Sequence, residues 1–353
     1  MKHALSRRGF VAGALAGYPL NAMPAQPPKH LPTGSLTDVP GLKAGHFTHT
    51  ERPTGCTVVL VEKGAVAGVD VRGGGPGTRE TDLLRPEMSV QQVHAVVLSG
   101  GSAYGLATAD GVMRYLEEKG IGFQAGQAIV PIVPAAILFD LRGEKRHIRP
   151  DASSGYEAAK AATNAPVPQG NLGAGAGATI GKMIGNRPMK GGLGSASLRL
   201  PGGLVVGAIA AVNCIGDVVD PDTGVVLAGA RAEDGKSLLN IAEQIRNGAD
   251  FPEPSAGQNT TIGIVAANVD WTKADASKVA QMAQDGLARA IRPAHMPFDG
   301  DTIFALGTGG RSVDRRLLGY IGALAADMMA QAIVSAILHA ESIEGYPAHR
   351  DLE

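Results

Sequence analysis

The sequence predicts a protein of the α/β or α+β class, built as one integrated domain. Short apolar runs rich in valine and isoleucine alternate with longer stretches of helical periodicity along the chain. No clear linker interrupts this alternation before about residue 248, and no fixed-period repeat is present. Hydrophobic residues make up 44% of the 353 residues, aromatic residues only 4%, and glycines number 49. We therefore expect layers that pack closely through glycine, alanine and valine.

The expected elements follow from the periodicity of the apolar residues. Short apolar runs predict buried strands at 57–61, 66–71, 94–98, 204–212, 261–267 and 302–306. Helical patterns lie at 103–119, 156–163, 237–246, 274–291 and 313–340. The last helix is small and apolar nearly all round, which predicts that it is buried between layers.

The N-terminus indicates export. The pair Arg7–Arg8, a short apolar run at 10–20 and the small-residue pattern ending at Ala25 are typical of a twin-arginine signal. We expect residues 1–25 to be this signal and the mature protein to be periplasmic or secreted; an uncleaved tail or anchor is the alternative. We expect no later segment to be long and apolar enough to cross a membrane.

Net charge and cysteine usage narrow the class of protein further. The formal net charge of −1 provides no basic field, so nucleic-acid binding is not expected. The two cysteines, Cys56 and Cys214, lie inside apolar runs. An exported protein could pair them, but their setting predicts small buried core residues rather than a disulfide.

Cofactor and metal motifs are weak. The stretch "NLGAGAGATIGK" at 171–182 fails the Walker pattern, and no acidic residue follows at the distance that a dinucleotide fold needs, so close backbone packing is favoured. The nine histidines are scattered, and His46 and His295 are expected to be loop or core residues. No cofactor and no metal ion are expected.

Ser102 is a candidate nucleophile of a conventional hydrolase. It lies between an apolar strand and a helix, as the serine of a nucleophile elbow does, but Tyr104 occupies the position that the elbow requires to be glycine. A helix N-cap is therefore the favoured interpretation of Ser102. A serine hydrolase that uses Ser102 with a distant histidine remains an alternative.

Three further segments carry polar residues beside predicted strands. Asn213 ends one strand, where a buried amide is costly unless it is paired. Asp299 and Asp301 flank a glycine before another strand, and Asn259-Thr260 opens a third. Local turn chemistry explains each of these segments when it is considered alone.

Taken in order, however, the motifs resemble one family. "GLKAGHFTHTERPTGCTVVL", "VRGGGPGTRETDLL", "VVLSGGSAYGLATADGVMRYLEEKGIGF", "KGGLGSASLRL", "VNCIGDVVDPDTG", "NTTIGIVAANV" and "FDGDTIFALGTG" together resemble the DmpA-like self-processing hydrolases, the L-aminopeptidase/D-Ala-esterase and β-aminopeptidase group. The resemblance runs from about Gly41 to Leu338. It implies a four-layer αββα sandwich similar to that of the N-terminal-nucleophile hydrolases, with the chain topology of this family.

The resemblance also implies a mechanism. The precursor would cut itself between Asn259 and Thr260, giving chains 26–259 and 260–353 that stay associated. Thr260 would be the nucleophile, and its freed α-amino group, with a reference pKa of roughly 7.7–8.0, would be the general base. Asn213 matches the family's oxyanion donor. Asp299 and Asp301 would hold the Thr260 amine and the ammonium group of the substrate.

The implied substrates are small peptides, amides or esters with a free N-terminal amine, and the implied assembly is a homo-oligomer. Three departures affect specificity. Thr260 stands where characterised members have serine, and Asp299 stands where the β-aminopeptidases have serine. In the stretch 130–141 some members have an acid that binds the substrate amine, but this chain has none there before Asp140. A non-catalytic binding protein on the same fold is a second alternative.

Overall fold

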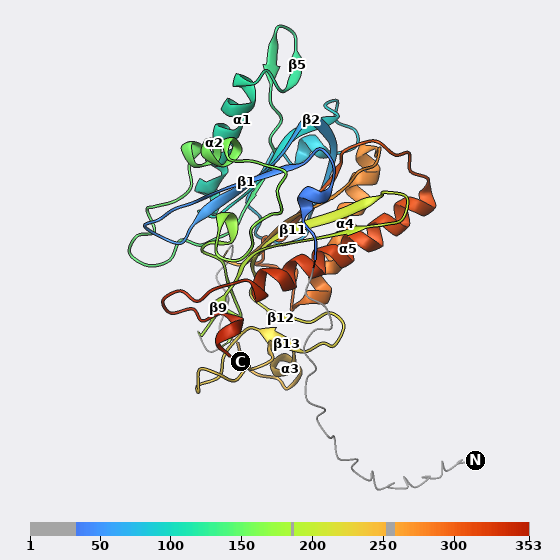
Figure 1. Cartoon of the computed structure of the whole chain (residues 1–353). Helices are drawn as coiled ribbons and strands as arrows, with labels where there is room; N and C mark the ends of the chain where they lie inside the picture. The colour runs from blue at the N-terminus through green and yellow to red at the C-terminus, as the bar shows by residue number, and fades with distance from the viewer. Residues whose placement is uncertain (1–32, 185–186, 252–257, 353) are drawn as a thin grey trace, which may run out of the picture.

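The computed structural model describes residues 33–184, 187–251 and 258–352, so the predicted signal at 1–25 lies outside the described residues. A nine-stranded sheet forms the centre of the molecule (Figure 1). Its order is β10-β11-β14-β16-β2-β4-β7-β3, and β1 pairs with β2 off this path. The strands are β1 (Lys43–Thr48), β2 (Gly55–Val71), β3 (Thr78–Arg79), β4 (Gln92–Ser99), β7 (Ala135–Ile137), β10 (Gly192–Arg199), β11 (Val205–Asn213), β14 (Thr260–Ala267) and β16 (Thr302–Gly307).

Strand β2 joins the two halves of this sheet. The sequence predicts two strands here, at 57–61 and 66–71, but the structure has one strand of 17 residues. Its first part pairs with β1 through Gly55–Leu60, and its last part pairs with β16 through Val66–Val71. The register with β4 shifts between Leu60 and Ala65, which marks the change from one half to the other.

Helices cover both outer faces. Helices α1 (Thr108–Glu118) and α2 (Ala152–Lys160) cover one face, and α4 (Lys273–Ala290) and α5 (Arg315–Leu338) cover the other. The short α3 (Ile241–Arg246) lies outside these layers and packs in a separate small cluster. Three buried clusters separate the layers. Within β14, Val265 belongs to the cluster against α4 and α5, while its neighbour Ile264 faces the inner cluster. Within β2, Val59 faces the same inner cluster, whereas Val58 packs with α1 and α2. The layers are therefore helices, strands, strands and helices, which confirms the predicted αββα sandwich.

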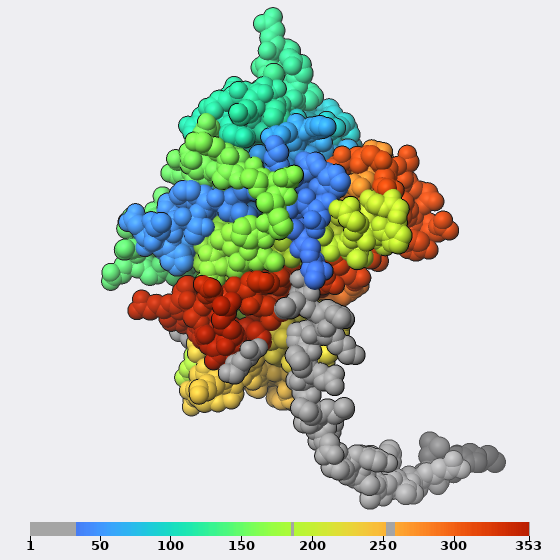
Figure 2. Space-filling model, in the orientation of Figure 1, coloured from blue at the N-terminus to red at the C-terminus, as the bar shows by residue number. Residues whose placement is uncertain are grey.

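Smaller sheets complete the fold. They are formed by β5 (Phe123–Ala125) with β6 (Ala128–Val130), β8 (Thr179–Ile180) with β9 (Met189–Lys190), and β12 (Asp217–Val219) with β13 (Val226–Ala228) and β15 (Ile291–Arg292). The β5–β6 hairpin projects from the body of the molecule beyond α1 (Figures 1 and 2).

Helix α5 corrects one expectation. Its 24 residues have a mean hydropathy of 1.8 in the best 18-residue window, so by length and composition it could cross a membrane. The expectation that no such segment follows the signal was wrong. The helix is largely buried, as predicted, since 72% of that window lies inside the protein. It is not buried between layers, however, because it forms part of an outer layer with α4. It packs tightly on β10, where a Cβ on Gly194 would lie 2.1 Å from the carbonyl oxygen of Ala332.

Two local predictions have different outcomes. Cys56 and Cys214 are both free and buried, as expected of core residues. Ser102 is not an N-cap: it is the first residue of a 3₁₀ turn, Ser102–Ala107, whose cap is Gly101 and receives no side-chain hydrogen bond. Gly101 has a φ of 85°, and the N–H of Ser102 donates to the carbonyl oxygen of Leu138. The glycine turn, and not a side-chain cap, therefore starts this helical segment.

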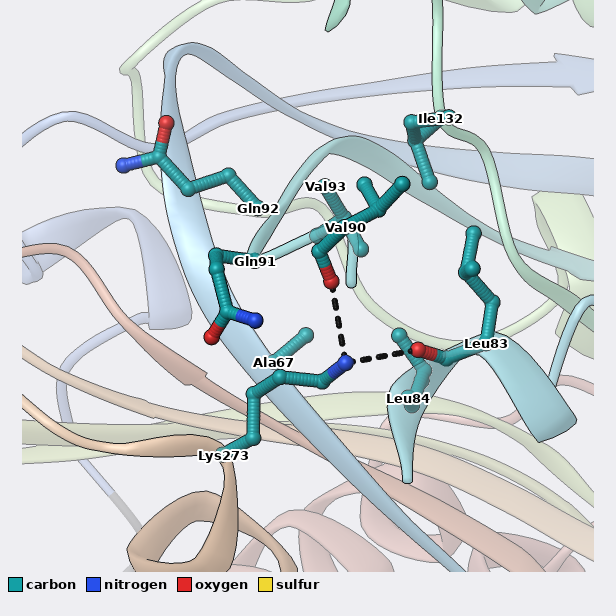
Figure 3. Close-up of a pocket in the computed structure, with 9 residues that line it drawn as sticks. All are labelled: Ala67, Leu83, Leu84, Val90, Gln91, Gln92, Val93, Ile132 and Lys273. Carbon is teal, nitrogen blue, oxygen red and sulfur yellow. Dashed lines mark hydrogen bonds between the residues drawn. The ribbon is translucent and has the colours of Figure 1, made fainter. Parts of the chain in front are cut away.

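Lys273, the first residue of α4, ties the helix to the chain around residue 85. The side chain is buried, with 3% of its surface exposed. Its Nζ donates to the carbonyl oxygens of Leu83, Met88 and Val90 at 2.8, 3.0 and 2.9 Å, and two of these bonds are drawn in Figure 3. One ammonium group thus satisfies three carbonyl groups that no strand or helix pairs.

We predict that Lys273→Met lowers the free energy of unfolding by about 2–4 kcal/mol, because three carbonyl oxygens lose their donor. Urea denaturation monitored by circular dichroism measures this change. Lys278→Met on the exposed face of the same helix is the matched control and should change stability by less than about 0.5 kcal/mol. Equal stability of the two variants would show that the Lys273 contacts contribute nothing.

Candidate active site

Strand pairing brings the predicted site residues together at the ends of the neighbouring strands β11, β14 and β16. Thr260 is the first residue of β14, and it lies opposite Asn213, the last residue of β11. Strand β16 runs parallel to β14, with Thr302 beside Ile262, so Asp301 precedes its strand next to the start of β14. Thr260, Asn213 and Asp301 are at most 2% exposed.

The peptide group between residues 259 and 260 is held from two sides. The Thr260 hydroxyl donates to the carbonyl oxygen of Asn259. The same oxygen accepts the N–H of Gly300 at 2.8 Å. A Cβ on Gly300 would lie 2.6 Å from the Thr260 hydroxyl oxygen, so this close approach requires glycine. The hydroxyl and the N–H donor therefore meet at the carbonyl that self-cleavage would attack.

Asn213 has a fixed orientation. Its Oδ1 accepts the N–H of Thr179 at 3.0 Å and the Nη2 of Arg142 at 3.4 Å. Its Nδ2 donates to the carbonyl oxygens of Phe139 and Gln258, both at 3.2 Å. Because two donors hold Oδ1, the amide must present its N–H groups toward the chain that leads to the 259–260 bond.

This geometry refines the role expected of Asn213. In the uncut chain its amide binds the Gln258 carbonyl, one residue before the Asn259 carbonyl that Gly300 holds. A side-chain amide and a backbone N–H are therefore two of the donors that line this part of the chain. The sequence suggested the first of them and not the second.

Asp301 anchors the start of β14. Its Oδ1 accepts the N–H of Thr261 at 2.7 Å, and its Oδ2 accepts the N–H and the Nδ1–H of His295, both at 3.1 Å. Burial opposes the charged form of His295, but the hydrogen bond and charge of Asp301 raise its pKa above the usual value. His295 therefore supports the site, which the prediction of a plain loop or core histidine missed.

Asp299 has a carboxyl oxygen without a partner. Its Oδ2 accepts the N–H of Met296 at 2.9 Å, whereas its buried Oδ1 has no hydrogen-bond partner among the described residues. The residue pairs with Asn259 in a parallel bridge. Burial, and then the charge of Asp301, raise the pKa of Asp299 to about 7. A carboxyl group with this pKa can accept a hydrogen bond from an amine or exchange a proton near neutral pH.

Lys182 is a site residue that the sequence did not suggest. Its Nζ donates to the carbonyl oxygens of Asn213 at 2.8 Å and Gln258 at 3.1 Å. Burial, and then the charge of Arg142, lower the pKa of Lys182 well below the usual value. Lys182 is the last residue of the glycine-rich stretch 171–182, for which nucleotide binding was not expected. Its amine lies beside Gln258, next to the predicted cleavage site.

The alternative nucleophile lies outside this cluster. No histidine among the described residues hydrogen-bonds to Ser102, so the structure gives it no base. Within 33–184, 187–251 and 258–352, no group of three or more histidine, cysteine, aspartate or glutamate side chains could hold a metal ion. The glycine-rich stretch packs closely, as predicted: a Cβ on Gly175 would lie 2.2 Å from the backbone nitrogen of Leu193.

Comparison with known proteins identifies the family. The model of peptidase family S58 matches residues 34–351. The chain belongs to peptidase family S58. This membership confirms the resemblance found in the sequence and makes the chain a hydrolase of peptide or amide bonds.

Two of the relatives that match this S58 chain are named as hydrolytic enzymes. A Mycobacterium leprae protein named as an uncharacterized aminopeptidase is 44% identical over 345 residues, covering 90% of this chain and 94% of the relative. A 6-aminohexanoate-oligomer endohydrolase of Kocuria sp. is 30% identical over 313 residues, covering 85% and 84%.

Solved structures agree with the S58 chain in fold. The L-aminopeptidase D-Ala-esterase/amidase of Ochrobactrum anthropi superposes with a TM-score of 0.67 at 17% identity, covering 90% of this chain and 92% of that one. A Burkholderia β-aminopeptidase gives a TM-score of 0.66 at 20% identity, covering 92% and 93%. The first of these is described as a variant of the N-terminal-nucleophile hydrolase fold, which is the fold class predicted for this chain.

Proposed function

We propose that this protein is a self-processing N-terminal-nucleophile aminopeptidase or amidase with Thr260 as its nucleophile. The observation that carries the proposal is the contact of the Thr260 hydroxyl with the Asn259 carbonyl oxygen, which also accepts the Gly300 N–H at 2.8 Å. A hydroxyl, its target carbonyl and an oxyanion donor are thus together in the uncut chain.

Self-processing begins when the Thr260 oxygen attacks the Asn259 carbonyl carbon. The Gly300 N–H stabilises the oxyanion that forms. Lys182 is the candidate base, because its pKa is lowered and its Nζ lies on the Gln258 carbonyl. It takes the hydroxyl proton and returns it to the leaving nitrogen, so the C–N bond breaks and an ester remains. Water then hydrolyses this ester, which leaves Thr260 with a free α-amine.

Turnover uses the same groups. The α-amine of Thr260, with a reference pKa of roughly 7.7–8.0, takes the hydroxyl proton as the oxygen attacks the substrate carbonyl. Once the Gln258 carbonyl moves away, the Nδ2 of Asn213 becomes available as a second oxyanion donor beside Gly300. The unpartnered Oδ1 of Asp299 accepts a hydrogen bond from an ammonium group, either that of Thr260 or that of the substrate. The Thr260 ammonium group gives its proton to the leaving nitrogen or oxygen of the substrate as the bond from that atom to the acyl carbon breaks. Water then hydrolyses the acyl-enzyme on Thr260.

The substrates that we propose are small peptides, amides or esters with a free N-terminal amine. The relatives named as aminopeptidases support this class. The 30% identical endohydrolases of 6-aminohexanoate oligomers support a second candidate, cleavage inside linear oligomers of amino acids. Analysis of products from a defined oligomer distinguishes the two: an aminopeptidase releases single terminal residues, whereas an endohydrolase releases internal fragments.

The proposal extends to assembly and location. Chains 26–259 and 260–353 should stay associated, because β14 and β16 of the second chain lie between β11 and β2 of the first. We further propose a homo-oligomer of such pairs, and export directed by the twin-arginine-like pattern at 1–25.

Intact mass spectrometry of the purified wild-type protein, with an assay on alanine p-nitroanilide, tests the proposal. We expect two fragments, the second beginning at Thr260, and release of p-nitroaniline. An uncut chain that still hydrolyses the amide would point to Ser102. An uncut chain without activity would favour a binding protein on this fold.

A further inference from the structure

A cavity of about 560 Å³ lies next to the candidate site. Its walls come from three segments, 48–53, 140–143 and 343–346, together with Gly177 and Thr179 and their neighbours. The volume is in the range of pockets that bind small molecules. Thr179 and Arg142 line the cavity and also hold Oδ1 of Asn213, so the cavity and the proposed oxyanion donor share a wall.

Two of the charges in this wall neutralise each other. The Nη2 of Arg52 lies 2.8 Å from Oδ1 of Asp140, and the pair is buried. Asp140 also accepts the Thr54 hydroxyl at 2.7 Å and the Gly101 N–H at 2.9 Å. These three donors and the complete burial of its side chain make Asp140 a poor acceptor for a substrate ammonium group. Asp140 is the acid in the stretch 130–141, where some family members bind the substrate amine. Its role here is therefore structural.

Arg142 has no such partner. Its Nη1 donates to the Gly177 carbonyl oxygen at 3.2 Å, its Nη2 reaches Asn213 Oδ1 at 3.4 Å, and it lies 5.9 Å from the ring centre of Tyr346. None of the ion pairs formed by the described residues includes this guanidinium group.

The remaining acidic groups of the cavity wall lie toward solvent. Glu51 and Glu344 line it with exposed side chains, and His49 is half-buried. Solvent screens the exposed carboxylates, whereas Arg142 is half-buried beside the site. Among the residues that the structure describes, the inner wall of the cavity therefore presents one uncompensated positive charge.

The Asn213 amide lies between the Arg142 guanidinium group and the bond that self-processing would cut. Arg142 binds its Oδ1, and the Gln258 carbonyl lies at its Nδ2. Gln258 and Asn259 are on the acyl side of the bond that self-processing cuts, so they mark where the acyl part of a substrate lies. The guanidinium group is therefore next to the acyl side of the site.

We propose that Arg142 binds a carboxylate carried by the acyl residue of the substrate, so that the enzyme prefers N-terminal glutamyl or aspartyl amides. This inference rests on the proposed function and names its substrate class. A guanidinium group binds carboxylate through two parallel N–H donors, and a neutral amide of the same shape cannot replace that interaction.

The test compares kcat/KM for glutamyl and glutaminyl p-nitroanilides, which differ only in this charge. We expect the wild type to favour the glutamyl substrate at least about tenfold, and Arg142→Met to bring the ratio to about one. The ratio is the proper readout, because any loss of turnover through Asn213 affects both substrates equally. Glu344→Gln, in the same cavity, is the matched control and should leave the ratio within about twofold of wild type.

A wild-type ratio of one or less overturns the inference, as does a preference that survives in Arg142→Met. If Arg142→Met does not fold, Arg142→Lys serves instead: it keeps the charge, loses the fork of donors, and should reduce the ratio several-fold. Failure of the proposed function is recognisable separately, since the chain would then stay uncut and leave alanine p-nitroanilide intact. A processed enzyme that cleaves the alanine substrate without preferring glutamyl contradicts this inference alone.

Discussion

A Thr260→Ala variant is expected to remain a single uncut chain and to lose at least about ten-thousandfold in kcat on aminoacyl amides. The substitution removes the hydroxyl that contacts the Asn259 carbonyl oxygen, so no ester forms and no α-amine is released. Nucleophile and base are therefore lost together, which is why the effect should exceed that of any other substitution in the site. Intact mass spectrometry and the p-nitroanilide assay measure the two consequences.

Two neighbouring substitutions are the controls. Thr260→Ser keeps the hydroxyl and should still be cut and active. Thr261→Ala removes the next hydroxyl along the strand but keeps the backbone N–H that donates to Asp301, so it should also be processed. Cleavage of Thr260→Ala at the wild-type site would exclude Thr260, and Ser102→Ala would then be the next variant to make.

Strands with continuous apolar sequences were predictable. The runs at 94–98, 261–267 and 302–306 became β4, β14 and β16, which lie inside the sheet and are buried. Strand β10 was missed, because its sequence "GLGSASLR" is rich in small residues and ends in exposed ones. Its position depends on pairing with β11 and on close contact with α5, which a local pattern does not contain.

Only those candidate site residues that lie in the ordered family motifs could be predicted from the sequence. The motifs named Thr260 and Asn213, and the register of β11 and β14 places the two residues opposite each other. Lys182 could not be predicted, since the contact of its Nζ with Gln258 joins residues 76 positions apart. Gly300 contributes only its N–H, which no side-chain pattern reveals. His295 looked like an isolated histidine because its contact with Asp301 depends on a backbone with a φ of 60°.

The second large effect concerns Asp299, whose replacement by asparagine should raise stability while it removes activity. The folded-state pKa of about 7 lies above the ordinary aspartate value of 3.8, so the native chain binds more protons than the unfolded chain between these values. The stabilisation by this group is complete below the unfolded pKa and is lost as pH rises through the folded one. Ionised Asp299 therefore opposes folding at pH 8.

Urea denaturation in a Thr260→Ala background, which keeps one chain, measures the stability change. We expect Asp299→Asn to add about 2–4 kcal/mol to the free energy of unfolding at pH 8 and much less at pH 4.5. Asp285→Asn, at an exposed position of α4, is the control and should change stability by less than about 0.5 kcal/mol at either pH.

In the processed enzyme with Thr260 intact, the same substitution should lower kcat at least about a hundredfold, because the ammonium group loses its charged acceptor. Wild-type activity should rise with pH through about 7, as Asp299 ionises and the Thr260 amine approaches its own pKa. If Asp299→Asn is less stable than its parent at pH 8, the Oδ1 of Asp299 is well solvated or hydrogen-bonded in the native chain. This result would contradict the proposed contact of Asp299 with the amine. A stabilised but inactive variant would instead show that the fold bears the cost of a buried carboxylate because catalysis requires it.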